Sequence, residues 1–445
     1  MKIQTLILAL LLSMVVSIAQ GQALPTAESS MASALGPNLP NLDGVFHYAL
    51  SASEVIQYGY YGSGETSYAT DLSGNAAYTS RSTVRPFSVL FAGGVILGNQ
   101  GGQGTTSFWN IAASQGYVTR HWIFNISDSF SFLPQSPTTG LSGIPGVGDL
   151  GAVPVQGPTA GPSGGILTTT GERIGNSVSG SVERQLARTT SISGSGSWSV
   201  LHYLGSSADG ENLDSADVTG VVSLNHRLDA LSSVSVSAVY SSYYFTGNSS
   251  NLDLPSFQTR GINISYQRVL SRSLSVNATV GPQWISSSNS ALIPNSTDVA
   301  VSGGLSYLYR NTIHFSASYS RGATQGSGVV PGAFSNGVVG SASRAYGRDW
   351  VVSLSGAYTR TSSLATFTPA NSLFSATGNY STVYGGAQVT RRLSTHFSGY
   401  ASYTAQNQSQ DQLSGPSAAN VLNGTSQTFG FGVTFTPRST NLGQF

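Results

Sequence analysis

Few side chains in this sequence could do chemistry, and their types exclude many classes of site. Cysteine is absent, which excludes disulfides, thiolate metal sites and thiol nucleophiles. The single lysine is Lys2, so the rest of the chain has no lysine for a phosphate-binding loop or a Schiff base. Five of the six histidines lie near one rim of the predicted fold but on different strands: His47, His121, His226, His314 and His396. A metal needs several ligands around one ion, so we expect no metal and no cofactor.

Arginine differs from these residues because it recurs at regular places. Eight short turns join stretches in which apolar and polar residues alternate, and the turns centre on Arg81, Arg120, Arg184, Arg227, Arg268, Arg310, Arg344 and Arg391. The interval is close to 42 residues, with one longer insertion. A repeat of strand, tight turn, strand and long Gly/Ser/Asn loop is typical of an outer-membrane β-barrel. The guanidinium groups could bind lipid phosphates there, or they could only keep the turns hydrated.

The composition agrees with a wall embedded in lipid. Charged residues make up 8% of the chain, where roughly 25% is usual for soluble domains. The net charge of +1 argues against a nucleic-acid partner. Aromatic residues make up 10%, which favours a folded protein over a disordered one.

The N-terminus predicts export. A short basic start, an apolar run over 3–18 and small residues at Ala19 and Ala23 indicate a secretory signal peptide over 1–23, with cleavage after either alanine. The alternative, a retained membrane anchor, needs a longer apolar run. Residues 24–43 are polar, contain proline and have no period, so we interpret them as a flexible periplasmic tether.

Strand alternation defines two faces. Over 188–203, serine alternates with apolar or small residues, and successive strand side chains point to opposite faces. The same rhythm recurs over 272–286, 311–322 and 425–437. The sequence therefore predicts a polar lumen with these candidates: Ser193, Ser195, Ser197, Asn277, Thr279, Gln283, Ser316 and Ser318.

Aromatic residues gather near the two ends of the predicted strands, with small and aliphatic residues between them. Such belts match the membrane–water interfaces, where one end of a ring lies in hydrocarbon and the other in water. We predict an aromatic girdle that contains Trp122, Trp198, Tyr240, Trp284, Trp350, Tyr358 and Tyr403.

The predicted fold is all-β: a closed antiparallel transmembrane β-barrel over 44–437, with about 18 strands, or 16 as the competing count. An even number returns both termini to the periplasmic side, with short periplasmic turns and long extracellular loops. Residues 438–445 form a C-terminal tail. We place these arginines at the periplasmic turns: Arg81, Arg120, Arg188, Arg227, Arg272, Arg310, Arg348 and Arg392.

Three features interrupt the regular pattern. A long Pro/Gly-rich loop over 134–172 either folds into the lumen as a constriction or covers the surface. Charged lumen candidates are few and scattered, and some could be solvated strand ends: Glu54, Glu183, Asp217, Arg260, Asp298 and Arg360. Asp128 has the parity of the lipid-facing residues on its strand, unless a β-bulge near Ser127 turns it inward.

Two His-x-Ser pairs, His314/Ser316 and His396/Ser398, are similar to an arrangement found in outer-membrane phospholipases. In that family the pair faces lipid near the outer leaflet. Parity places both pairs of this chain in the lumen beside periplasmic turns, so the geometry does not suit catalysis. No acidic pair has the spacing of an omptin-like protease. We expect no enzyme activity.

Across 44–437 the chain resembles the porin-like outer-membrane barrels of diderm bacteria, and the terminal Phe445 is similar to the aromatic that the barrel-assembly machinery of this class recognises. The polar tail "PRSTNLGQF" departs from the usual form. The resemblance implies assembly by that machinery with periplasmic chaperones, contact with outer-membrane lipids and lipopolysaccharide, and the possibility of homo-oligomers.

Two functions are open at this point. The first is passive diffusion of small polar solutes through a neutral lumen, with weak charge selectivity because rings of charge are absent from the pattern. The second is a non-conducting barrel that serves as a structural scaffold, an export component or a partner-docking surface. A fibrous secreted adhesin is a third and more distant alternative.

Overall fold

The computed structural model describes residues 45–59, 66–80, 82–98, 105–133, 172–204, 214–246, 256–310, 312–327, 330–364, 379–411, 423–437 and 440–441. The predicted signal peptide, the tether, Arg81, nearly all of the 134–172 loop and Phe445 lie outside these ranges. Within the described ranges there is no helix long and apolar enough to cross a membrane.

Every long element is a strand. The first nine are β1 Val45–Tyr58, β2 Thr66–Thr79, β3 Phe87–Gly98, β4 Thr106–Val118, β5 Trp122–Leu133, β6 Glu172–Ala187, β7 Thr190–Leu204, β8 Asp214–Arg227 and β9 Ser232–Thr246. The others are β10 Phe257–Ser271, β11 Leu274–Ser287, β12 Ser296–Tyr309, β13 Ile313–Ser327, β14 Val330–Tyr346, β15 Trp350–Ser363, β16 Asn379–Arg392, β17 Phe397–Asp411, β18 Gly424–Phe435 and the short β19 Thr440–Asn441.

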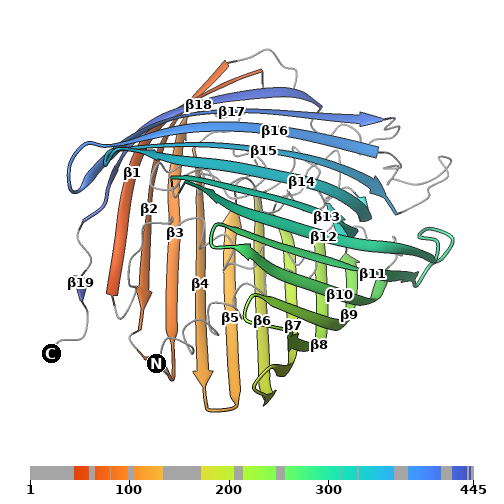
Figure 1. Ribbon diagram of the computed structural model, residues 1–445. Helices are drawn as coiled ribbons and strands as arrows, with labels where there is room; N and C mark the ends of the chain where they lie inside the picture. The colour runs from red at the N-terminus through yellow and green to blue at the C-terminus, as the bar shows by residue number, and fades with distance from the viewer. Residues whose placement is uncertain are drawn as a thin grey trace.

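The strands close into one antiparallel barrel, as predicted. Each strand from β1 to β18 pairs with its neighbours in sequence, and β1 also pairs with β18, from Leu50 opposite Phe435 to Tyr58 opposite Gln427. Figure 1 shows β1 and β18 side by side although they lie at opposite ends of the chain. Eighteen long strands are therefore confirmed over the competing count of 16.

Two details differ from the expected pattern. The tail contributes β19, whose Asn441 and Thr440 pair with Val45 and Phe46 of β1. The β13–β14 hairpin extends beyond the alternation predicted over 311–322, because pairing continues to Ser327 opposite Val330. This extension matters for the site described below.

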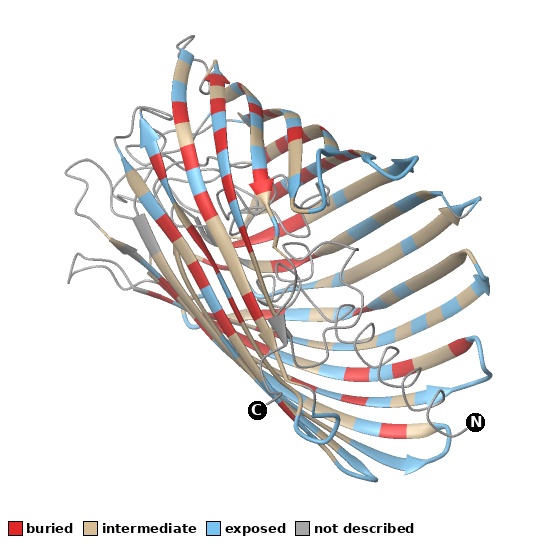
Figure 2. Cartoon of the chain, turned by 90° about the vertical axis from the view of Figure 1, so that its left-hand side faces the viewer, coloured by how far each residue is buried: buried red, intermediate tan, exposed pale blue. Residues whose placement is uncertain are grey.

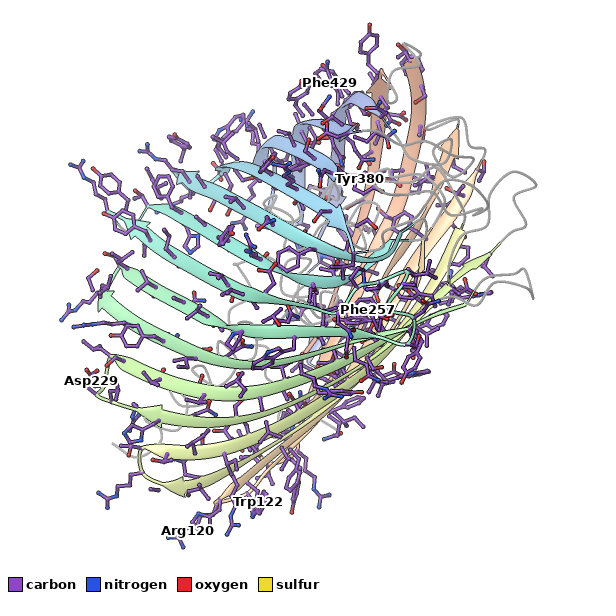
Figure 3. The ribbon with its side chains drawn as sticks, turned by 90° about the vertical axis from the view of Figure 1, so that its right-hand side faces the viewer. Arg120, Trp122, Asp229, Phe257, Tyr380 and Phe429 are labelled. Atoms are coloured by element: carbon purple, nitrogen blue, oxygen red, sulfur yellow. The ribbon has the colours of Figure 1, made fainter. Side chains whose placement is uncertain are left out.

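Exposure alternates along the strands (Figure 2). On β7, Ile192 and Trp198 are exposed at 40% and 47%, whereas Ser191 and Ser199 are buried. Figure 3 places Trp122 and Phe429 on the outside of the wall and Tyr380 on the inside. We call the face with the exposed large apolar side chains the outer face and the opposite one the inner face. A face of large apolar side chains turned outward suits contact with hydrocarbon.

The strand ends define two rims. The eight short connections, from β2–β3 to β16–β17, form one rim, which we call the turn rim. The opposite rim, at which the longer connections such as 205–213 and 365–378 leave the strands, is the loop rim. This division follows the predicted arrangement of periplasmic turns and extracellular loops.

Glycine is required at one tight crossing of the wall. The β10–β11 ladder is interrupted opposite Gly281 and Pro282, where the proline has no N–H to donate. A Cβ on Gly281 would lie 2.0 Å from the carbonyl oxygen of Ile262. The backbones of β10 and β11 approach too closely there for any side chain.

Gly281→Ala should therefore destabilise the barrel by about 1–3 kcal/mol, the usual range for overpacking. Gly220→Ala is the matched control, because nothing lies within 4 Å of a Cβ at that position of β8. Urea unfolding in lipid vesicles measures both variants. Equal stability of the two variants would contradict the close β10–β11 approach.

Candidate functional site

Hydroxyl groups on the inner face form the most continuous chemical feature of the wall. Serines of adjacent strands meet across the ladder, with Oγ–Oγ distances of 2.6 Å for Ser127–Ser179 and for Ser316–Ser341. Because strand side chains alternate, a serine at every second position places all of these hydroxyls on one face. The result is a neutral surface of groups that both donate and accept hydrogen bonds.

All eight predicted lumen residues lie on the inner face. Their own contacts are local: Asn225 donates to the Ser193 Oγ at 3.2 Å, and the Thr279 hydroxyl donates to the Ser265 Oγ at 2.9 Å. Ser195 and Ser318 are exposed, and the others are half-buried: Ser193, Ser197, Asn277, Thr279, Gln283 and Ser316. That these side chains line a conducting path stays a prediction.

Two of the charged candidates for the lumen point the other way. Glu54 lies on the outer face of β1, paired with the exposed Phe431, and accepts a hydrogen bond from Thr70 at 2.8 Å. Arg260 lies on the outer face of β10 between Tyr240 and Trp284, which are 41% and 42% exposed. The lumen assignment was wrong for both residues, because strand parity and not charge sets the direction of a side chain.

The remaining candidates divide between the faces. Glu183 and Asp217 lie on inner faces, and Asp217 is buried beside Ser199, whose hydroxyl donates to its carboxylate. Asp298 has inner parity on β12 and forms an ion pair with Arg321 at 3.0 Å. Arg360 has the outer parity of Tyr358 on β15, so its placement in the lumen was also wrong. Among the described residues, charge is therefore scattered along the inner face and forms no ring.

The seven predicted girdle residues are all exposed, with 37–47% of the residue surface accessible: Trp122, Trp198, Tyr240, Trp284, Trp350, Tyr358 and Tyr403. Trp122 and Trp350 lie at the turn rim, where arginines cover their rings. The Arg184 guanidinium lies 5.1 Å from the Trp122 ring centre, and that of Arg391 lies 5.0 Å from the Trp350 ring centre. Three tyrosines have similar arginine neighbours: Tyr117, Tyr309 and Tyr346.

These pairs bring together the predicted turn arginines and the predicted girdle aromatics, which were predicted independently. The turn arginines lie next to the girdle rings of the same rim, and each exposed cation–π contact contributes about 0.5–1 kcal/mol. The other predicted turn arginines within the described ranges are exposed at that rim: Arg120, Arg188, Arg227, Arg272, Arg310, Arg348 and Arg392. Arg310 adopts a positive φ of 48°, which the tight β12–β13 turn imposes.

Side-chain acceptors close the turns. In the β8–β9 turn, the Asp229 carboxylate accepts hydrogen bonds from the Ser232 hydroxyl and the Leu231 N–H, both at 2.6 Å. These two contacts, the Ser232 bond foremost, lower the pKa of Asp229 below its ordinary value, so the side chain stays charged in mild acid. Figure 3 shows Asp229 at the same rim as Arg120 and Trp122.

The histidines do not assemble into a site. His314 Nε2 lies 3.2 Å from the Ser306 Oγ on the neighbouring strand, whereas Ser316 pairs with Ser341. His396 contacts Thr395 within its own turn. The His-x-Ser pairs therefore share no hydrogen bond, and the described residues contain no group of three potential metal ligands.

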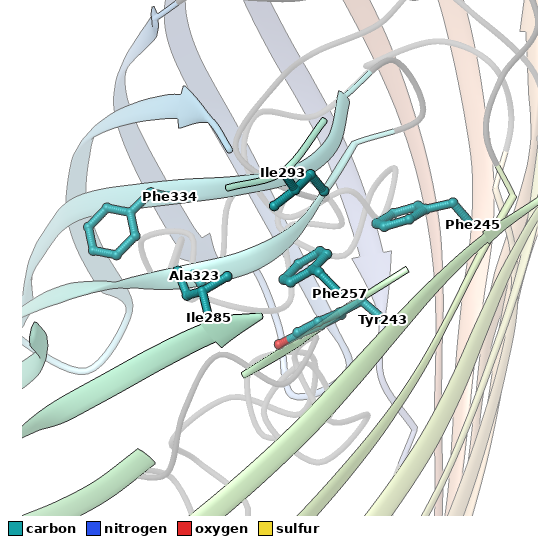
Figure 4. Close-up of a cluster of buried hydrophobic side chains, with 7 residues drawn as sticks. All are labelled: Tyr243, Phe245, Phe257, Ile285, Ile293, Ala323 and Phe334. Carbon is teal, nitrogen blue, oxygen red and sulfur yellow. The ribbon is translucent and has the colours of Figure 1, made fainter. Parts of the chain in front are cut away.

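A cluster of apolar side chains on the inner face at the loop rim was not predicted. Phe257 of β10 is fully buried and stacks on Tyr243 of β9 with ring centres 4.5 Å apart, and Phe245 lies 6.1 Å from it (Figure 4). Ile285 and Ile293 complete the part of the cluster that comes from β9–β12. The sequence did contain a signal for this cluster. Aromatic residues occupy both odd and even positions of the segment 240–245, so some of them must lie on the inner face.

The β13–β14 hairpin packs against this cluster. Its residues Ala323 and Phe334 have the outer parity of their strands, yet both belong to the buried cluster (Figure 4). Gly332, with a φ of +79°, lies so close that a Cβ would be 2.8 Å from the Phe257 ring. The outer face of the hairpin end therefore lies against the inner face of β9–β12, which narrows the barrel at the loop rim.

Asp128 points outward, as its parity predicted. The β4–β5 and β5–β6 registers run without a bulge, and the Asn176 Nδ2 donates to the Asp128 Oδ1 at 2.9 Å. Its outer-face neighbours Phe124 and Ile126 are 42% and 57% exposed. A carboxylate thus lies midway along a lipid-compatible strand, with a single amide partner.

Comparisons with known proteins give structural matches only. No family model and no curated protein matches this chain. Pseudomonas aeruginosa OccK2 (OpdF) matches with a TM-score of 0.45 and 9% identity, over 89% of this chain and 98% of that one. Pseudomonas aeruginosa OprD gives 0.43 and 10%, over 90% and 96%.

The unliganded ferric citrate transporter FecA gives a TM-score of 0.39 and 12% identity over 82% of this chain, which spans 60% of the length of FecA. Likenesses of this size carry no argument about solutes. The architecture rests on the strand pairings, which close 18 long strands into a cylinder. The chain folds as a closed antiparallel β-barrel.

Asp128→Asn should stabilise the barrel by about 1 kcal/mol, because it removes a charge from a lipid-facing position and keeps an acceptor for Asn176. Asp349→Asn, in the hydrated β14–β15 turn, is the control and should change stability by less than about 0.5 kcal/mol. Urea unfolding in vesicles measures both. If Asp128→Asn instead destabilises the barrel, the carboxylate faces water or a cationic group and not hydrocarbon.

Proposed function

We propose that this chain is an outer-membrane channel for passive diffusion of small polar solutes, with weak charge selectivity. The observation that carries the proposal is the inner face of hydroxyl and amide groups, in which Ser195 and Ser318 are exposed. Such groups exchange hydrogen bonds with water and with sugar-like solutes without favouring either sign of charge.

The charge distribution supports weak selectivity. Selective pores usually carry rings of charged side chains. The described carboxylates with inner parity lie on four separate strands: Asp71 on β2, Glu183 on β6, Asp217 on β8 and Asp298 on β12. Asp217 is hydrogen-bonded and buried, and Asp298 is paired with Arg321, so their fields in the lumen are weakened.

The same proposal covers location and partners. A closed barrel leaves no unpaired edge in hydrocarbon, and a cleaved signal peptide would bring the chain to the periplasm. We propose that periplasmic chaperones and the barrel-assembly machinery insert it into the bacterial outer membrane. Its outer face then contacts membrane lipids and lipopolysaccharide, and a homo-oligomer is compatible with the exposed wall.

One observation favours the alternative, a non-conducting structural or partner-docking barrel. Inner-face residues of β16, β17 and β1 are almost inaccessible to water: Tyr380 is 1%, Gln408 0% and Gln57 2% exposed. The hairpin cluster also occupies part of the loop rim. A barrel closed in this way could serve as an export component or surface scaffold without passing solutes.

Conductance of the purified barrel in a planar lipid bilayer separates the two functions. A diffusion pore gives stepwise conductance with a reversal potential near zero in a salt gradient. Ser195→Glu should then increase the cation-to-anion permeability ratio by up to about fivefold, since a unit charge interacts with about 1 kcal/mol at 4 Å in water.

The matched control for Ser195→Glu is Glu54→Gln, which changes a charge on the outer face and should leave the permeability ratio unchanged. Barrels that insert and show no steps would contradict the pore and favour the scaffold. A wild-type channel that strongly prefers cations or anions would contradict weak selectivity.

A further inference from the structure

A cleft lies at the loop rim where two neighbouring strands separate. Pairing between β12 and β13 ends at Val301 opposite Arg321, so residues 296–300 of β12 pair with β11 alone. Beyond that point, outer-face residues of β13–β16 lie against residues of β11 and β12. The space between them has a volume of about 460 Å³, which lies in the range of small-molecule sites.

The cleft has a polar lining with a positive balance. Its polar side chains include Asp298, Arg321, Asn336, Arg360 and Asn379. The Arg321 Nη2 is engaged by the Asp298 Oδ1 at 3.0 Å, and its guanidinium also lies 4.9 Å from the Phe334 ring centre. This pair is neutral.

Arg360 supplies the uncompensated charge. Among the described residues, no carboxylate lies within ion-pair distance of its guanidinium, although it lines the same cleft as Asp298. A guanidinium with free donors in a partly enclosed site attracts an anionic oxygen group, and bidentate contact with phosphate or carboxylate is its preferred geometry.

The neighbours of Arg360 suit hydroxyl groups. Asn336 pairs with Arg360 across β14–β15, and Asn379 pairs with Ser362 across β15–β16. Carboxamides and hydroxyls both donate and accept, so they match the alternating hydrogen-bonding demands of a sugar ring. Phe334, which is buried beside the cleft, gives this pocket an apolar side.

We propose that the cleft between β12 and β13 binds an anionic saccharide, with Arg360 on its phosphate or carboxylate group and Asn336 and Asn379 on its hydroxyls. The proposal deepens the proposed channel function, on which it rests, by naming a ligand class for one position of the wall. The anionic sugar comes either from a free solute or from the phosphorylated sugar headgroup of lipopolysaccharide.

Calorimetric titration of the detergent-solubilised barrel with glucose 6-phosphate, glucose and inorganic phosphate tests the site. Glucose 6-phosphate should bind at least tenfold more tightly than either of the others. Arg360→Gln should weaken it at least tenfold, as expected for loss of a charged hydrogen-bonding partner. Arg260→Gln is the matched control: it removes an outer-face arginine that does not line the cleft, and affinity should stay within twofold.

Three outcomes would overturn the proposal. Equal binding of glucose and glucose 6-phosphate would remove the role of charge. Inorganic phosphate that binds as tightly as the sugar phosphate would remove the role of the hydroxyls. Equal losses of affinity in Arg360→Gln and Arg260→Gln would show that binding is not specific to the cleft. Unboiled migration in SDS gels verifies that both variants are folded.

A competition arm identifies the source of the ligand. If purified lipopolysaccharide displaces glucose 6-phosphate, the cleft binds the lipid headgroup. If glucose 6-phosphate stays bound in the presence of lipopolysaccharide, the ligand is a free solute. Both results support the site. Ligand binding can be measured whether or not the barrel conducts, so the binding test and the conductance test can give independent results. Binding without conductance retains the site and overturns the pore, and conductance without binding retains the pore and overturns the site.

Discussion

Closure of the backbone hydrogen-bond ladder is the constraint on which the rest of the structure depends. Hydrocarbon cannot satisfy backbone N–H and C=O groups, so a sheet that crosses a membrane must have no free edge. Pairing of β1 with β18 meets this demand. Once the sheet is closed, each strand has one side in lipid and one inside the cylinder, and the two-residue period of its sequence divides accordingly.

The division between faces explains why so much could be predicted from the sequence. Trp198 and Ser197 are adjacent in the chain but lie on opposite faces. The outer residue is apolar and the inner one is polar, so the residue types alone indicate the two faces. The turn arginines mark the strand ends equally clearly, and a guanidinium next to Trp122 or Trp350 is compatible with a membrane interface. Strand number and register parity therefore follow from local pattern.

The direction of three charged residues was predicted wrongly, and the structure of the loop rim could not be predicted from local pattern. Glu54, Arg260 and Arg360 were predicted to face the lumen, whereas the parity of their strands places all three on the outer face. Glu54 accepts a hydrogen bond from Thr70 there. The contact between Phe257 and the β13–β14 hairpin joins segments distant in sequence. It depends on the separation of β12 from β13 over residues 296–300, before Val301, and no local pattern signals that separation.

Because the chain has no cysteine, introduced cysteines can report directly which face of a strand meets water. Single cysteines at positions 192–198 of β7, in barrels reconstituted into lipid vesicles, are exposed to a charged, membrane-impermeant thiol reagent. A closed cylinder with its hydroxyls inside predicts rapid labelling at Ser193, Ser195 and Ser197 and slow labelling at 192, 194, 196 and 198. Uniform labelling, or rapid labelling at the even positions, would contradict a closed cylinder with its hydroxyls inside.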